Sequence, residues 1–174
     1  MLCHLRVLFT VVVLSVSAPT LGYSPGSIAP SVSRSEATEA LTGFYEQWKQ
    51  TYFARGCGED RAYVNIRGDG RRTIGGGAAA KSITVSEAHG YGMLILVMMS
   101  RLDPEAQSEF DAMLRYFLDH QADSGRGLMA WNQVEGCVNS VKEEGGYSAT
   151  DGDVDIAYAL LLADRVWGSN GAFD

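Results

Sequence analysis

The chain has 174 residues, of which 46% are hydrophobic, and a formal net charge of −7. This length and apolar content suit one compact domain rather than two. The acidic balance argues against nucleic acid or an anionic membrane as the partner, because both carry negative charge themselves.

Residues 1–22 have the layout of a signal peptide. A short start with a positive charge at Arg6 precedes the apolar run from Val7 to Val16, and small residues follow. The apolar run is short for a membrane span, so we expect the signal peptide to be cleaved near residues 18–23. The mature protein is then expected to be secreted and extracellular, with no membrane partner. An uncleaved signal anchor is the alternative. Loss of Arg6 leaves 13 basic against 21 acidic residues, a charge of −8.

Residues 23–34 are rich in Ser, Pro and Gly and indicate a flexible leader. A first helix is expected from Ser35, a candidate N-cap, because apolar and aromatic residues recur at helical spacing up to Tyr52. Residues 54–83 are glycine-rich and indicate a long loop, with room for short strands near residues 63–66.

Three further helices are expected. The second runs from Glu87 to Arg101 behind Ser86 as N-cap, and its run 93-MLILVMM-99 is apolar on nearly all faces, which predicts burial. The third starts at Asp103 and Pro104 and carries an apolar stripe. That stripe consists of Phe110, Met113, Leu114, Phe117 and Leu118.

A glycine-rich stretch at 121–147 precedes the fourth helix, which is expected from Asp151 to Trp167 with Thr150 or Ser148 as cap. No series of alternating strands is evident in this pattern. The sequence therefore predicts an all-α fold.

Two cysteines, Cys57 and Cys137, would remain after removal of the signal peptide, which carries Cys3. Both lie beside glycines in loop-like sequence. In an oxidising compartment they could form one disulfide or remain two thiols, and the sequence leaves both open. No Cys-x-x-Cys or Cys/His cluster is present, so we expect no metal and no cofactor.

Glu87 and Asp151 are the candidate catalytic residues. The stretches 84-TVSEAHGYGM-93 and 148-SATDGDVDIAYALLLADRVW-167 each place a carboxylate in the first turn of an apolar helix. The helix dipole favours a carboxylate there, so a capping role is the simpler explanation. However, both helices must be buried, and the long loops would bring their starts to one end of the helical layer. Two carboxylates facing a cleft are what glycosidic bond cleavage requires, one as acid and another to orient the sugar or activate water.

Of the acids next to Asp151, Asp155 lies one turn on and shares its helix face, whereas Asp153 points elsewhere. One of these acids is expected to be a structural cap or a partner for a neighbouring loop, and a structural role is expected for Asp155. The three aspartates of 151-DGDVD-155 do not form an EF-hand calcium loop, because Ile156 and Leu162 occupy the positions that need Gly and Glu.

Three residues are candidate substrate-binding groups. Tyr91 lies one turn from Glu87, Trp131 lies between glycine-rich loops, and His89 faces another direction from Glu87. Each has a plainer alternative as a core or wall residue.

The stretches 84-TVSEAHGYGM-93, 127-GLMAWNQ-133 and 148-SATDGDVDIAYALLLADRVWGS-169 resemble signature blocks of glycoside hydrolase family 8, the endoglucanase, chitosanase, lichenase and xylanase family. The resemblance implies an (α/α)6 barrel, of which this chain holds about the first half, and inverting, endo-acting hydrolysis of a β-1,4-linked polysaccharide.

By the same resemblance, Glu87 matches the proton donor and Trp131 a sugar-stacking tryptophan. Asp151 matches an aspartate described either as nucleophile or as a residue that positions the sugar. Two departures are Ala88, where the family has glycine, and His89, where it has Gln or Met. The general base comes later in the family, beyond Asp174.

Residues 35–174 are thus expected to be part of a glycoside hydrolase domain that acts as a monomer on a cellulose, β-glucan or chitosan type of polysaccharide. A truncated, inactive carbohydrate-binding fragment is the alternative, and a purely structural helical domain is a third possibility.

Overall fold

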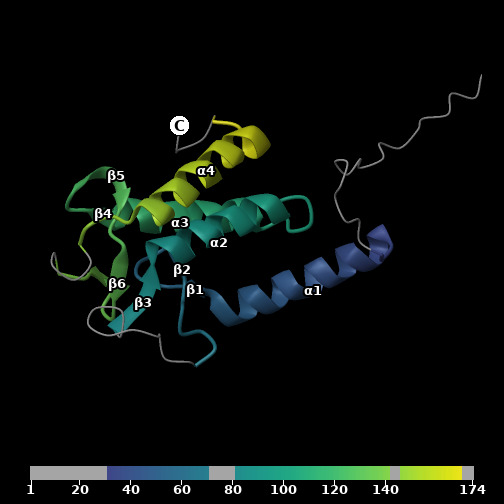
Figure 1. Ribbon diagram of the computed structural model, residues 1–174, viewed down its shortest axis with the longest axis horizontal. Coiled ribbons are helices and arrows are strands. Elements are labelled where there is room, and N and C mark those ends of the chain that lie inside the picture. Colours follow the sequence, from purple (N-terminus) through teal and green to yellow (C-terminus); the bar gives the residue numbers. More distant parts are fainter. Residues whose placement is uncertain (1–30, 71–80, 142–145, 170–174) are drawn as a thin grey trace, which may run out of the picture.

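A computed structural model describes residues 31–70, 81–141 and 146–169. The predicted signal peptide and most of the predicted leader lie outside them. Four helices dominate the described residues, and short strands gather at one end of the bundle (Figure 1). The helices are α1 (Arg34–Tyr52), α2 (Ser86–Met99), α3 (Ala106–Asp119) and α4 (Thr150–Trp167). None of them is long and apolar enough to cross a membrane.

The helices alternate in direction. α1 and α3 run toward the strands, whereas α2 and α4 begin beside the strands and run away from them (Figure 1). α2, α3 and α4 lie side by side, and α1 projects beyond them. The starts of α2 and α4 therefore share one end of the molecule.

Short antiparallel strands occupy the two glycine-rich stretches that were predicted as long loops. β1 pairs with β2, β3 with β6, β6 with β7, and β4 with β5. The strands are β1 (Phe53–Arg55), β2 (Ala62–Val64), β3 (Ser82–Val85), β4 (Gln121–Ala122), β5 (Gly125–Met129), β6 (Asn132–Val134) and β7 (Val138–Asn139). Strands of two to five residues are too short to show an alternating pattern, which is why the prediction of loops missed most of them.

The helix starts differ from the predicted caps. α1 is capped by Ser33, which forms a capping box with Glu36, so the prediction of Ser35 was wrong. Ser86 is the first residue of α2 and not its cap, and no side chain caps α4. Asp103 lies ahead of α3 and accepts a hydrogen bond from the Glu105 backbone at 2.8 Å.

The core lies between α2, α3 and α4. Most of the apolar run of α2 is buried or half-buried as predicted, except Met98, which is 73% exposed. Most of the α3 stripe is buried as well. Leu118 is the exception, because its side chain is exposed at the end of α3. The fully or nearly fully buried side chains of this core include Met93, Leu96, Val97, Phe110, Met113, Phe117 and Ile156.

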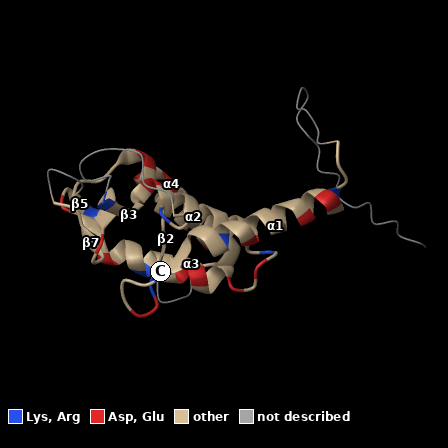
Figure 2. Ribbon diagram, turned by 90° about the horizontal axis from the view of Figure 1, so that it is seen from below, with Lys and Arg blue, Asp and Glu red and all other residues tan. Residues whose placement is uncertain are grey.

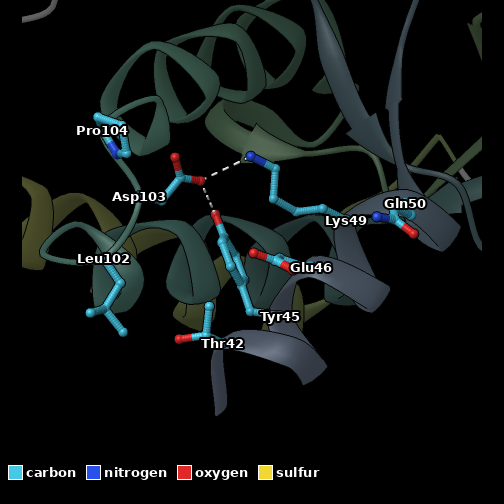
Figure 3. Close-up of a pocket in the computed structure, with 8 residues that line it drawn as sticks. All are labelled: Thr42, Tyr45, Glu46, Lys49, Gln50, Leu102, Asp103 and Pro104. Carbon is cyan, nitrogen blue, oxygen red and sulfur yellow. Dashed lines mark hydrogen bonds and ion pairs between the residues drawn. The ribbon is translucent and has the colours of Figure 1, made fainter. Parts of the chain in front are cut away.

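A charged network fastens α1 to the rest. The Lys49 ammonium lies 2.9 Å from Asp103, and the Tyr45 hydroxyl donates to Asp103 at 2.6 Å (Figure 3). The same ammonium lies 2.6 Å from Glu109. Burial would lower the pKa of Lys49, but its two carboxylate partners outweigh burial and raise it. A pocket of about 350 Å³ opens beside this network, near the turn that follows α2. It is therefore at the far end of α2 from Glu87.

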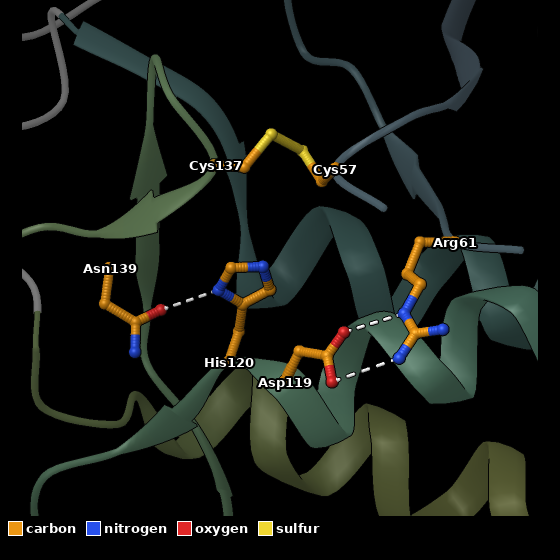
Figure 4. The surroundings of a disulfide bond; sticks show 6 residues. All are labelled: Cys57, Arg61, Asp119, His120, Cys137 and Asn139. Carbon is orange, nitrogen blue, oxygen red and sulfur yellow. Dashed lines mark hydrogen bonds and ion pairs between the residues drawn. A yellow bond between two sulfur atoms is a disulfide. The ribbon is translucent and has the colours of Figure 1, made fainter. Parts of the chain in front are cut away.

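The two loop cysteines form a disulfide, which settles the question that the sequence left open. Cys57 and Cys137 are joined across 80 residues with their Cα atoms 5.4 Å apart (Figure 4). Each has a positive φ, 64° and 60°, and follows a glycine in a tight turn. The bond ties the β1–β2 turn to the β6–β7 turn.

Backbone contact joins the starts of α2 and α4. A Cβ atom added to Gly152 would lie 2.6 Å from the Ser86 Cβ and 2.7 Å from the Ser86 carbonyl carbon. A Cβ added to Gly90, one turn further along α2, would lie 2.7 Å from the Asp155 Cβ. The two helices therefore approach as closely as their backbones permit, and only glycine fits at both positions.

This contact predicts that Gly152→Ala is destabilising. The added methyl meets backbone as well as side-chain atoms of Ser86, so α4 must shift, and we expect a loss of about 1–3 kcal/mol in the free energy of unfolding. Urea denaturation followed by circular dichroism measures it. Gly43→Ala is the matched control, because nothing lies within 4 Å of its added Cβ. That helical change should be neutral or stabilising by up to about 1 kcal/mol. Equal effects of the two substitutions would contradict the close contact.

Candidate active site

The structure brings Glu87 and Asp151 together at the surface. Both lie in the first turns of their helices, and the contact of Ser86 with Gly152 places the two helix starts side by side. Both side chains are exposed. The two helix starts therefore converge as expected. The predicted burial of α4 was wrong, however, because only Gly152, Ile156 and Ala159 are buried in it. The catalytic roles of Glu87 and Asp151 stay predictions.

Tyr91 belongs to the same surface. The Glu87 charge raises the pKa of the Tyr91 phenol most, and the charge of Asp155 raises it next. Asp151 adds a smaller contribution of the same sign. Negative charge thus surrounds an exposed tyrosine, and Figure 2 shows the acidic residues at the start of α4. This placement suits Tyr91 for contact with a hydroxyl-rich ligand.

Glu87 does not lie in an apolar pocket of the described residues. An apolar setting keeps a carboxylic acid protonated, but the Glu87 side chain is exposed. The apolar residues of α2 begin beyond its first turn and face α3 and α4. The described residues therefore supply carboxylates and Tyr91 as its neighbours, not an apolar pocket.

Trp131 lies directly beside the start of α2. Its carbonyl accepts a hydrogen bond from the Ser86 backbone at 3.0 Å, and its N–H donates to the Tyr147 carbonyl at 2.8 Å. The Ala130 N–H donates to the His120 backbone carbonyl at 2.9 Å, and the Ala130 carbonyl accepts a hydrogen bond from the Gln133 side-chain amide at 2.6 Å. The half-buried tryptophan is thus fixed one residue away from Glu87.

The other two acids in the first turns of α4 have structural contacts. The Asp153 carboxylate accepts the Met129 N–H at 3.0 Å and so fastens the end of β5 to α4. Asp153 is thus the acid of this stretch that contacts a neighbouring segment. Asp155 is half-buried, and its Cβ lies against Gly90. Asp151 is the most exposed of the three, with its carboxylate accepting the Gly152 N–H at 2.8 Å.

His89 does not face the site. Its side chain is completely buried, its Nε2 lies 3.0 Å from the Met113 carbonyl oxygen, and its ring stacks on Tyr116 at 5.3 Å. Direct contact with a substrate, predicted for this residue, is therefore wrong in this structure. Residues i and i+2 point in different directions on a helix, and here the second direction is the core.

Sequence reasoning missed two residues of this site. Ser86 was expected only as a cap, although its backbone binds Trp131 and its side chain packs on Gly152. Tyr147 was not considered. The available signal was the pair of glycines, Gly90 and Gly152, inside otherwise apolar helices, because glycine there indicates close helix contact. Among the described residues no group of three or more His, Cys, Asp or Glu could hold a metal ion.

Burial of His89 predicts a pH-dependent stability. Burial lowers the pKa of His89 to about 3, below the usual value of 6.5, so between these values the unfolded chain binds a proton that the folded chain does not. Stability should therefore fall as the pH drops from 6.5 toward 3, by up to about 1.4 kcal/mol per pH unit from this residue. Urea denaturation at pH 7.5 and 5.0 measures the difference. In His89→Gln the loss between these two pH values should be smaller, and an unchanged loss would contradict the assignment.

Comparisons with known proteins agree with the resemblance. The profile of Glycosyl hydrolases family 8 matches residues 26–174. A "Beta-glucanase" of Niallia circulans is 40% identical over 87% of this chain, and "Endoglucanase A" of Acetivibrio thermocellus is 36% identical over the same share. The apo structure of a β-1,3-1,4-glucanase from Paenibacillus sp. X4 superposes with a TM-score of 0.74 at 39% identity, over 87% of this chain.

The match covers only part of each relative. The chain spans 34% of the Niallia protein, 28% of the Acetivibrio protein and 36% of the Paenibacillus chain, about a third rather than the half that was expected. The helix pairs of this chain are consistent with part of the helical barrel that the family implies. The match over nearly the whole sequence leaves one conclusion: the chain belongs to glycoside hydrolase family 8.

Proposed function

We propose that this chain contributes the acid side of an endo-acting glycoside hydrolase that cleaves β-1,4-linked polysaccharide of the cellulose, β-glucan or chitosan type with inversion. The observation that carries the proposal is the placement of Glu87, Asp151 and Trp131 around one backbone junction, which is formed by Ser86 and Gly152. The names of the relatives support a glucan as the first substrate to test.

Glu87 is assigned as the proton donor. Its carboxyl proton passes to the glycosidic oxygen as the bond to the anomeric carbon breaks, so that the leaving sugar departs as an alcohol. In an inverting reaction a water molecule attacks the anomeric carbon from the opposite face and gives its proton to a second carboxylate, about 6.5–9.5 Å from the acid. We assign that base to no residue of this chain.

Asp151 and Trp131 hold the sugar. The Asp151 carboxylate, one helix start away from Glu87, can accept hydrogen bonds from sugar hydroxyls and favour a distorted ring. The face of the Trp131 ring can pack against the C–H face of a sugar, and its fixed peptide groups keep that ring in place.

Glu87→Gln tests the acid assignment. Glutamine keeps the shape but has no proton to donate, so we expect the release of reducing ends from β-1,3-1,4-glucan or carboxymethylcellulose to fall by about 10²–10⁴-fold. Xylan and chitosan, assayed in parallel, identify the preferred polymer. Glu39→Gln, an exposed change on α1, is the control and should leave the rate unchanged.

Two outcomes would contradict part of the proposal. Hydrolysis that persists unchanged in Glu87→Gln would remove the acid role. Polysaccharide binding without any hydrolysis, by a wild-type protein that supplies the second carboxylate as well as this chain, would favour the carbohydrate-binding alternative over the hydrolase.

We further propose that the protein is secreted. The pattern of residues 1–22 supports this, and so does the Cys57–Cys137 disulfide, because such bonds persist in oxidising compartments. N-terminal sequencing of the protein from culture medium should find a start near residues 18–23. Protein that stays in the cell with its first residues intact would contradict secretion.

A further inference from the structure

Tyr147 lies directly opposite Trp131 on a neighbouring backbone segment. Ala130 and Ser148 form an antiparallel bridge, and the same register pairs Trp131 with Tyr147, whose carbonyl accepts the Trp131 N–H at 2.8 Å. Residues directly opposite each other in such a pair point to the same side, with Cβ atoms about 4.5–5.5 Å apart. Ala130, the neighbour of Trp131, is fully buried and so points to the other side. The two aromatic side chains therefore share one surface.

We propose that Tyr147 is a second sugar-binding aromatic residue, which extends the binding surface beyond Trp131. The inference rests on the proposed function. Tyr147 is 47% exposed, and a tyrosine side chain carries both a flat apolar face and a hydroxyl. A sugar ring offers the matching pair of features, a C–H face and hydroxyl groups.

The backbone around Tyr147 is held in place on both sides. Trp131 binds its carbonyl, and the carbonyl of the preceding Gly146 accepts the Asp123 N–H at 2.9 Å. The bridge at Ser148 follows directly. A ring carried by a fixed backbone loses little conformational entropy when a ligand binds, which favours affinity.

The register also gives the order of the residues. Val85 pairs with Asn132, and the Ser86 N–H continues the pairing to Trp131, which in turn pairs with Tyr147. Neighbouring strands lie about 4.8 Å apart, so Tyr147 is one strand further from Glu87 than Trp131 is. A polysaccharide that passes from Glu87 over Trp131 continues onto Tyr147. A ligand of two sugars at Trp131 does not need to reach it.

Calorimetric titration of the full chain with cellohexaose and with cellobiose tests this order. In Tyr147→Ala we expect about tenfold weaker binding of the hexasaccharide, the loss typical of one well-packed aromatic contact, and less than a twofold change for the disaccharide. Tyr147→Phe keeps the ring and should stay within about threefold of wild type. Tyr158→Ala, a change at a similarly exposed tyrosine of α4, is the matched control and should not alter either affinity.

The outcomes separate this inference from the proposed function. If Trp131→Ala weakens binding and Tyr147→Ala does not, or if Tyr147→Ala weakens both ligands equally, the role of Tyr147 is overturned while the proposed function stands. If the wild-type chain binds neither oligosaccharide, both are overturned.

Discussion

The backbone contact between α2 and α4 is the constraint on which the site depends. Side chains usually keep packed helices 8–10 Å apart, but Gly90 and Gly152 let these two approach until backbone atoms touch. Two helix N-termini, each with positive partial charge, then lie together. Carboxylates in the first turns offset that charge, so Glu87 and Asp151 stabilise the junction whatever else they do. The capping role and the catalytic role are therefore compatible, since one position serves both.

The segments that carry Trp131 and Tyr147, here called the Trp131 wall, are held beside the acids by a different set of interactions. The centre of this wall is the peptide of Trp131, which is bonded to Ser86 on one side and to Tyr147 on the other. Because Ser86 also packs on Gly152, a displacement of α4 would move the tryptophan as well as the acids. The geometry of the wall and the geometry of the carboxylates are thus coupled through one small buried residue.

The sequence patterns predicted the four helices well and their starts poorly. Long apolar runs at helical spacing leave little ambiguity about where a helix lies. Its first residue is harder to predict: Ser86 was predicted as an N-cap but packs inside the first turn of α2, and Ser33, not Ser35, forms the capping box of α1 with Glu36. His89 shows the same limit, because spacing places it off the face of Glu87 without revealing that the other direction is the core. The convergence of Glu87 and Asp151 followed from burial and loop length alone. Trp131 and Tyr147 meet through a single bridge, which no local pattern could show.

Two physical sources stabilise the two parts of this site. The acids depend on the apolar contacts of α2 and α4, which do not change with redox conditions. The Trp131 wall belongs to a small sheet with few buried apolar side chains, and its hairpin is tied down by the disulfide across 80 residues. Chain entropy gives such a bond about 4–5 kcal/mol, a large part of the stability of a domain. Reduction of the disulfide should therefore weaken the Trp131 segment first and reach the acids only through its hydrogen bond to Ser86.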